Sequence, residues 1–151
     1  MNRIQLVEEL LSASRKSAIA QMGFWERPRE YAPGDTLYMR EAHFIVAVGL
    51  EGHPTMSEMA RRLNVTQGAV TQTATRLENK GYVVRAKDPK DRRQTTVALT
   101  EKGKKLCAEH VRYDQSQYRQ VSQWLGDFSD EDLALFIRYE QNKRAIFTTH
   151  E

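Results

Sequence analysis

The sequence of 151 residues is poor in the features that mark secreted and membrane proteins. It contains one cysteine, Cys107, which excludes an internal disulfide and makes a cytoplasmic location the simplest expectation. No apolar run approaches the roughly 20 residues that a membrane-spanning helix requires. The N-terminal segment, with a helical pattern and two glutamates, does not have the composition of a signal peptide.

Motifs for catalysis are missing as well. The sequence has no glycine-rich phosphate loop, no His-Glu metal motif and no nucleophile elbow. A small enzyme that uses His43, His110 or Cys107 is therefore a hypothesis without a supporting motif. We expect that the chain is not an enzyme and requires no cofactor.

Positive charge is concentrated in the middle of the chain. Residues 61–105 contain 12 Lys or Arg and four Asp or Glu, which gives this segment a charge of +8 within a chain of net charge +3. The remaining residues therefore carry −5. A basic segment between acidic flanks is typical of a polyanion-binding region, although a solvated basic surface produces the same asymmetry.

Helical periodicity, caps and turn residues predict the order of the elements. Thr55 and Glu58 have the spacing of a capping box, Thr66 is a candidate N-cap, and residues 23–36 have the Pro and Gly content of a loop. The predicted helices cover residues 2–22, 37–50, 55–63, 66–80 and 100–125, with a last helix after the cap at 129–132.

Residues 81–100 predict a hairpin with a basic tip. Two β-prone runs, 81–85 and 95–99, flank a turn at Asp88 and Pro89. The basic residues of the tip are Lys87, Lys90, Arg92 and Arg93. Helix, turn, helix and hairpin in this order predict a mainly α (α+β) fold, a winged helix-turn-helix.

The amphipathic first and last helices predict a dimerisation region. An apolar stripe on a helix has to be buried, and no sheet is available for these helices to cover. Residues 1–36 and 104–151 are therefore expected to pack against each other and against a second copy, outside a DNA-binding domain at residues 37–103. A two-fold dimer would match palindromic half-sites.

The helix predicted at residues 66–80 has a polar face without an acid until Glu78. Its inward positions are Ala69, Val70, Thr73, Ala74 and Leu77, and its outward positions are Gln67, Thr71, Gln72, Thr75, Arg76 and Asn79. Such side chains bond base edges and phosphates, and a face that lacks acids suits the negative potential of a DNA groove. An ordinary solvated face is the alternative, but such faces usually mix glutamate with lysine.

Several segments resemble the MarR family, the multiple antibiotic resistance regulators of bacteria and archaea. They are Met56–Gln67 (MSEMARRLNVTQ), Val70-Thr71, Leu77–Val83 (LENKGYV), and Asp88–Arg93 (DPKDRR) followed by Leu99–Gly103 (LTEKG). The last of these is the most specific signature of the family. The order of the predicted helices agrees with the family across the whole chain.

The resemblance implies a homodimer that binds a palindromic operator in double-stranded DNA. Helix 66–80 would enter the major groove and the wing, 85–96, would reach the minor groove, with Arg93 as the minor-groove or wing-anchoring residue and Asp91 as its partner. The expected DNA-binding residues are Thr66, Gln67, Gly68, Thr71, Gln72, Thr75, Arg76, Arg85, Lys87, Lys90, Asp91, Arg92 and Arg93.

Members of the family are mostly repressors released by small ligands, often phenolic, by cysteine oxidation or by a metal. Oxidation is not expected here, because the reactive cysteine of the family's peroxide sensors lies near the N-terminus, whereas Cys107 is interpreted as a buried or partly buried helix cysteine. An aromatic effector would occupy a crevice between the dimer helices and the DNA-binding lobe, unless the same aromatic residues simply fill the dimer core. They are Phe24, Trp25, Tyr31, Tyr38 and Phe44.

A metal effector is the alternative. His110 and Asp114 lie on one helix face, four residues apart. The family's zinc-responsive repressors carry histidines near His43 and His110, and a glutamate that Glu109 matches. The chain departs from that pattern because Ala42 replaces an acidic neighbour and Asp114 stands where a second histidine is expected. Helix histidines that hydrogen bond within the protein are the commoner case.

The sequence therefore predicts a homodimeric, sequence-specific DNA-binding regulator, a ligand-responsive repressor. The alternatives are a zinc-responsive repressor of the same family and a protein-interaction adaptor with the same fold. The basic wing argues against the adaptor.

Overall fold

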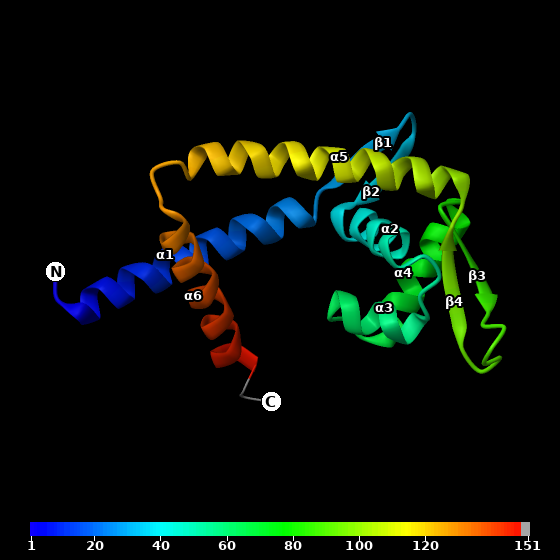
Figure 1. Ribbon diagram of the computed structural model, residues 1–151, viewed down its shortest axis with the longest axis horizontal. Helices are drawn as coiled ribbons and strands as arrows, with labels where there is room; N and C mark the ends of the chain where they lie inside the picture. Colours follow the sequence, from blue (N-terminus) through cyan, green and yellow to red (C-terminus); the bar gives the residue numbers. More distant parts are fainter. Residues whose placement is uncertain (149–151) are drawn as a thin grey trace. The chain divides into compact units, whose positions relative to one another are not determined.

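The computed structural model describes residues 1–148 and is mainly helical, with two small antiparallel sheets (Figure 1). The chain divides into two compact units, Met1–Val111 and a second that begins at Arg112. The predicted division into dimerisation and DNA-binding regions has other boundaries and stays a prediction. Over the described part of the chain, none of the helices has the length and apolar character to cross a membrane.

The first unit contains a winged helix-turn-helix, as predicted. Its elements are α2 (Met39–Glu51), α3 (Met56–Leu63), α4 (Gln67–Asn79), β3 (Val83–Lys87) and β4 (Thr95–Leu99). The two wing strands are antiparallel, and Thr55 adds a bridge to Thr96 beside them. Apolar side chains from every one of these elements are buried in one core, including Phe44, Ile45, Val48, Met59, Val70, Leu77, Tyr82 and Val97.

Local signals set the ends of the helices around the turn. Thr55 Oγ1 accepts a hydrogen bond from the Glu58 amide, and the Glu58 carboxylate accepts one from the Thr55 amide, so the capping box is confirmed. Asn64 ends α3 in the left-handed conformation, at φ 53°. Thr66 then caps α4 by accepting from the Ala69 amide at 3.2 Å.

The loop predicted at residues 23–36 is wrong for most of its length. Helix α1 (Arg3–Trp25) continues to Trp25, and β1 (Pro28–Ala32) and β2 (Asp35–Tyr38) form a hairpin around Gly34, whose φ of +74° suits a turn. The hairpin forms because its side chains find partners in the winged domain. Leu37 is fully buried, and Tyr31 packs against the core.

The second unit starts within α5 (Glu101–Trp124) and includes α6 (Asp130–Thr148). Ser129 and Asp132 cap α6 by reciprocal hydrogen bonds of 3.0 and 3.2 Å between backbone and side chain, as the sequence predicted. The rings of Phe128 and Phe136 meet edge to face, with 5.3 Å between their centroids.

Candidate nucleic-acid interface

The predicted faces of α4 are both found in the structure. Val70, Ala74 and Leu77 are buried, and Ala69 and Thr73 are half-buried. The outward residues are all exposed, namely Gln67, Thr71, Gln72, Thr75, Arg76 and Asn79. Among them the hydroxyls of Thr71 and Thr75 donate to backbone carbonyls one turn earlier. The exposed face of α4 is therefore polar and free of acids, as expected.

A buried carboxylate connects α4 to the start of α2. Glu41 is 1% exposed and accepts hydrogen bonds from the Tyr38 amide at 2.9 Å and from Nε of Arg76 at 3.2 Å. Nζ of Lys80 lies 4.0 Å from the same carboxylate. Arg76, expected to contact DNA, is therefore also part of the packing between the two helices.

A second ion pair joins α4 to the wing. Glu78 accepts two hydrogen bonds from the guanidinium of Arg85, at 2.6 and 3.0 Å, and one from the Arg85 amide. The hydrogen bond from Arg85 is the main cause of a pKa of Glu78 below its ordinary value. Arg85, also expected at the DNA, thus fixes the wing against the end of α4.

The wing tip is held by two aspartates. Asp88 Oδ1 accepts from the amides of Lys90 and Asp91, at 2.7 and 3.2 Å. Asp91 accepts from the Arg93 amide at 3.0 Å and from the side chain of Gln94 at 3.2 Å. Asp91, expected to be the partner of Arg93, thus accepts a hydrogen bond from the Arg93 backbone amide. The charged ends of Lys90, Arg92 and Arg93 lie on the exposed tip.

The base of the wing contains a network that sequence reasoning did not identify. The Tyr82 hydroxyl donates to Asp35 at 2.7 Å, and Lys102 pairs with the same carboxylate at 2.5 Å while lying 4.2 Å from the Tyr82 ring centroid. Burial and the adjacent Asp35 raise the pKa of Tyr82. The network joins the β1–β2 hairpin to β3 and α5. A tyrosine followed by a lysine 20 residues later gives no sequence signal for it.

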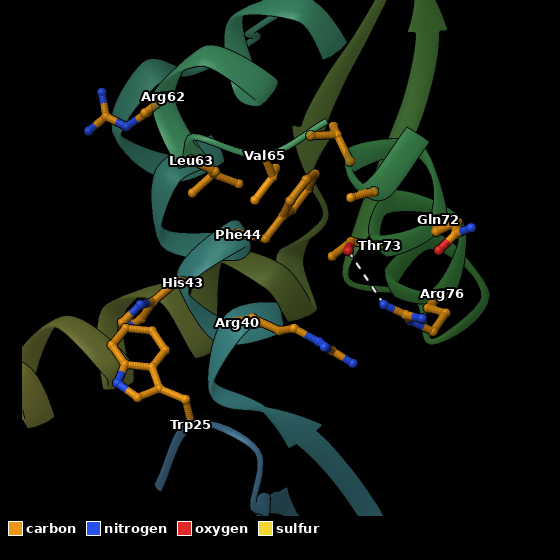
Figure 2. A pocket seen from close by; sticks show the side chains of 12 residues that line it. Trp25, Arg40, His43, Phe44, Arg62, Leu63, Val65, Gln72, Thr73 and Arg76 are labelled. Atoms are coloured by element: carbon orange, nitrogen blue, oxygen red, sulfur yellow. Dashed lines mark hydrogen bonds between the residues drawn. The ribbon is translucent and has the colours of Figure 1, made fainter. Parts of the chain in front are cut away.

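A cavity of about 520 Å³ lies between the end of α1, α2 and the helix-turn-helix. Trp25 and Phe44 supply aromatic walls, and Arg40, Arg62 and Arg76 supply positive charge. The other lining residues are His43, Leu63, Val65, Ala69, Val70, Gln72 and Thr73. Figure 2 shows the side chains of Arg40 and Arg76 extending toward each other, with Arg76 bonded to Thr73. The cavity combines an apolar wall with cations.

The five aromatic residues predicted to line an effector crevice are not all together. Only Trp25 and Phe44 line this cavity. Arg29 lies over the ring of Phe24, and Arg40 over that of Tyr38. The Tyr31 hydroxyl is 3.2 Å from Nδ1 of His110.

Two of the candidate metal ligands are neighbours in the first unit. The rings of His43, from α2, and His110, from α5, have centroids 5.2 Å apart, and each offers a nitrogen within 4.8 Å of the other's. Trp25 meets His43 edge to face at 4.6 Å. Asp114 follows His110 by one turn of α5, whereas Glu109 is exposed on that helix.

Residues 38–94, which span the helix-turn-helix and the wing tip, match the model of the MarR family. The match covers 57 of the 151 residues, so this part of the chain is similar to the MarR family. The relatives named below are described as transcriptional regulators, which agrees with the expectation that the chain is not an enzyme.

Two curated transcriptional regulators are similar to parts of this chain. An uncharacterised HTH-type transcriptional regulator of Bacillus cereus is 45% identical over 49 residues, 32% of this chain and 31% of that protein. The transcriptional regulator AdcR of Streptococcus pneumoniae is 32% identical over 85 residues, which are 56% of this chain and 58% of AdcR. The chain thus spans between about a third and three fifths of these relatives.

Solved structures share the fold over nearly the whole chain. FabT of Streptococcus pneumoniae, crystallised with DNA, has a TM-score of 0.66 at 23% identity and covers 98% of this chain and 99% of its own. ZitR of Lactococcus lactis, a zinc-responsive MarR family member, has a TM-score of 0.70 at 19% identity. The alignment covers 97% of this chain and 99% of ZitR. PcaV of Streptomyces coelicolor, crystallised with its natural ligand, has a TM-score of 0.67 at 17% identity. The alignment covers 99% of this chain and 100% of PcaV.

Proposed function

We propose that the protein is a homodimeric transcriptional regulator that binds a palindromic operator, with α4 in the major groove and the wing at the minor groove. The observation that carries this proposal is the exposed face of α4, which has no acid and lies beside a wing with a basic tip. Polar side chains read base edges, and cations add salt-dependent affinity for phosphates.

The ion pairs within the domain divide the predicted DNA-binding residues into two groups. Arg76 and Arg85 are bonded to Glu41 and Glu78, so their first role is to hold α4 and the wing in place. Gln72 projects from the middle of the exposed face and is the best-placed side chain for reading a base. A glutamine amide bonds adenine with two hydrogen bonds in the major groove.

Exposed apolar side chains support a dimer. Helix α1 has no buried residue, and Ile4, Ile19 and Met22 are more than 60% exposed. In the second unit, Trp124 is 71% and Ile137 60% exposed. Amphipathic helices of a soluble protein bury such residues against a partner, and a second copy is the partner that two-fold DNA sites require.

Selection of bound duplexes from a random pool tests the DNA-binding proposal. We expect an inverted repeat with half-sites about one helical turn apart, and affinity that falls steeply with salt. Gln72→Ala should relax the preference at one base pair per half-site and cost roughly tenfold or more in affinity. A protein that sediments as a monomer, or that selects no duplex at low salt, would contradict the proposal.

The cavity beside α4 supports regulation by a small ligand. Its aromatic wall and its arginines suit an amphipathic organic acid, and Arg76 connects it directly to α4. Such a ligand would act by changing the separation of the two recognition helices, which makes the protein a ligand-responsive repressor. Benzoate and salicylate are the first compounds to test, with Arg40→Gln as the variant that should weaken their release of operator DNA.

Zinc is the second candidate effector, because His43 and His110 lie together and imidazole nitrogens and carboxylates are zinc ligands. The Tyr31 hydroxyl lies 3.2 Å from Nδ1 of His110 and orients its ring, as an outer partner of a metal-binding histidine does. Calorimetry with zinc should show binding that His43→Ala and His110→Ala each abolish. Unchanged binding in both variants would rule out this pair.

A further inference from the structure

A second recess, of about 240 Å³, lies between the wing and the two helices of the helix-turn-helix. It is lined by Thr55, Met56, Ser57, Gln67, Thr71, Arg93, Gln94 and Thr95. Seven of these eight side chains are polar, one is a cation, and none is an acid. The recess therefore offers hydrogen-bond donors and one positive charge, which is the chemistry that an oxyanion requires.

The polar groups of the recess are arranged by contacts within the protein. Nε2 of Gln67 donates to Oγ of Ser57 at 2.6 Å, which brings α4 against the start of α3. Because a serine hydroxyl both accepts and donates, Ser57 keeps its own O–H as a donor. The Arg93 amide is fixed by Asp91, so the residue that supplies the positive charge sits on an ordered turn.

Glu58 and Asp91, two carboxylates near the lining residues in the sequence, take part in other hydrogen bonds. Glu58 accepts from the amide and hydroxyl of Thr55, at 2.7 and 2.8 Å. Asp91 accepts from the Arg93 amide and the Gln94 side chain. These bonds lower the pKa of both carboxyl groups. Neither carboxylate lines the recess, so an anion there would not meet one directly.

The position of the recess identifies the anion. One wall belongs to α4 and the other to the wing, and the two elements are proposed to enter neighbouring grooves. In a duplex the strand that separates a major groove from the adjacent minor groove is a sugar-phosphate backbone. A recess between the two elements therefore faces that backbone.

We propose that this recess holds one phosphodiester of the operator in each half-site, with the Ser57 hydroxyl and the Arg93 guanidinium as donors. The proposal rests on the proposed DNA-binding function. It assigns Arg93 to a phosphate instead of a minor-groove base edge and leaves Lys90 and Arg92 to reach the groove. It also adds Ser57 to the DNA-contacting residues.

Single methylphosphonate substitutions test the proposal, because they remove one phosphate charge at a time. The full-length protein would be titrated against the selected operator with the substitution moved along the backbone between the two grooves. We expect one position per half-site at which neutralisation weakens wild-type binding roughly tenfold or more, as loss of a charged hydrogen bond should. For Arg93→Gln and Ser57→Ala, neutralisation at that position should have little further effect.

Lys90→Gln is the matched control, since Lys90 is a wing cation outside the recess. It should retain the full wild-type loss at the sensitive position. Arg93→Gln should weaken binding to all sequences equally and reduce the salt slope, with unchanged base preference. Relaxed preference at an A·T pair, or equal losses in wild type and Arg93→Gln, would overturn the recess assignment. Failure of the wild type to select any duplex would instead reject DNA binding itself.

Discussion

Glu41 and Arg76 connect the start of α2 to the proposed DNA-reading helix through one buried carboxylate. Nε of Arg76 donates to Glu41 Oε1 at 3.2 Å, and the Glu41 side chain is 2% exposed while that of Arg76 is 47% exposed. A buried acceptor costs free energy whenever its donor is lost, whereas the exposed guanidinium can return to water. The position of α4 thus depends more on Glu41 than on Arg76.

Glu41→Gln should lower the free energy of unfolding by about 1 kcal/mol, and Glu41→Ala by about 2 kcal/mol. The glutamine loses the charged contact with Arg76, and the alanine also leaves the Tyr38 amide without its acceptor. Urea unfolding followed by circular dichroism measures both values. Glu51→Gln is the matched control. Its pair with Arg62 is exposed on both sides, so we expect a change near zero. Equal costs at the two glutamates would show that burial of Glu41 is unimportant.

The Glu78–Arg85 pair should make the stability of the wing depend on acidity. A carboxyl group whose pKa is lower in the folded state stabilises the fold above its unfolded pKa, about 4.3, and that stabilisation is lost as pH falls through the folded value. The stability difference between wild type and Glu78→Gln should therefore shrink as pH falls from 6 to 3. Urea unfolding across this range measures it. In an Arg85→Ala background the same substitution should show a much weaker pH dependence, and an unchanged dependence would assign it to another partner.

The winged domain could be predicted because local sequence patterns mark its helices and strands. The capping box of Thr55 and Glu58, the Thr66 cap and the two β-prone runs of the wing are local signals, and each is found in the structure. The β1–β2 hairpin was missed because its stability comes from distant contacts, such as Asp35 with Tyr82 and Lys102. The same limit applies to the candidate site. The exposed face of α4 followed from helical spacing, whereas the roles of Glu41 and Ser57 depend on which elements meet in space.

Gly103 should be intolerant of even the smallest side chain. A Cβ at this position would lie 2.1 Å from the backbone carbonyl oxygen of Tyr82, which cannot move without shifting β3. Gly103→Ala should therefore destabilise the protein by about 2 kcal/mol or more, despite the better helix propensity of alanine. Gly68→Ala in α4 is the control, since only Thr66 Oγ1 lies as near as 4.0 Å, and it should be neutral or slightly stabilising. Thermal unfolding of the two variants compares them, and similar melting temperatures would contradict the close approach at Gly103.

Cys107 should react slowly while the protein is folded. Burial raises the pKa of its thiol, and Sγ is so close to α2 that a Cβ on Gly49 would lie 2.6 Å from it. Because the thiolate is the reactive form, a raised pKa and limited access both reduce alkylation at neutral pH. Iodoacetamide should modify the native protein at least about tenfold more slowly than the urea-unfolded chain. A free cysteine is half ionised at a pH of about 8.5, and the alkylation rate of the native protein should keep rising above that pH. Gly49→Ala should loosen this packing and speed the reaction, whereas Gly23→Ala, at a glycine with nothing within 4 Å of the added Cβ, should not. A native rate equal to that of the unfolded chain would restore oxidation of Cys107 as a route to releasing DNA.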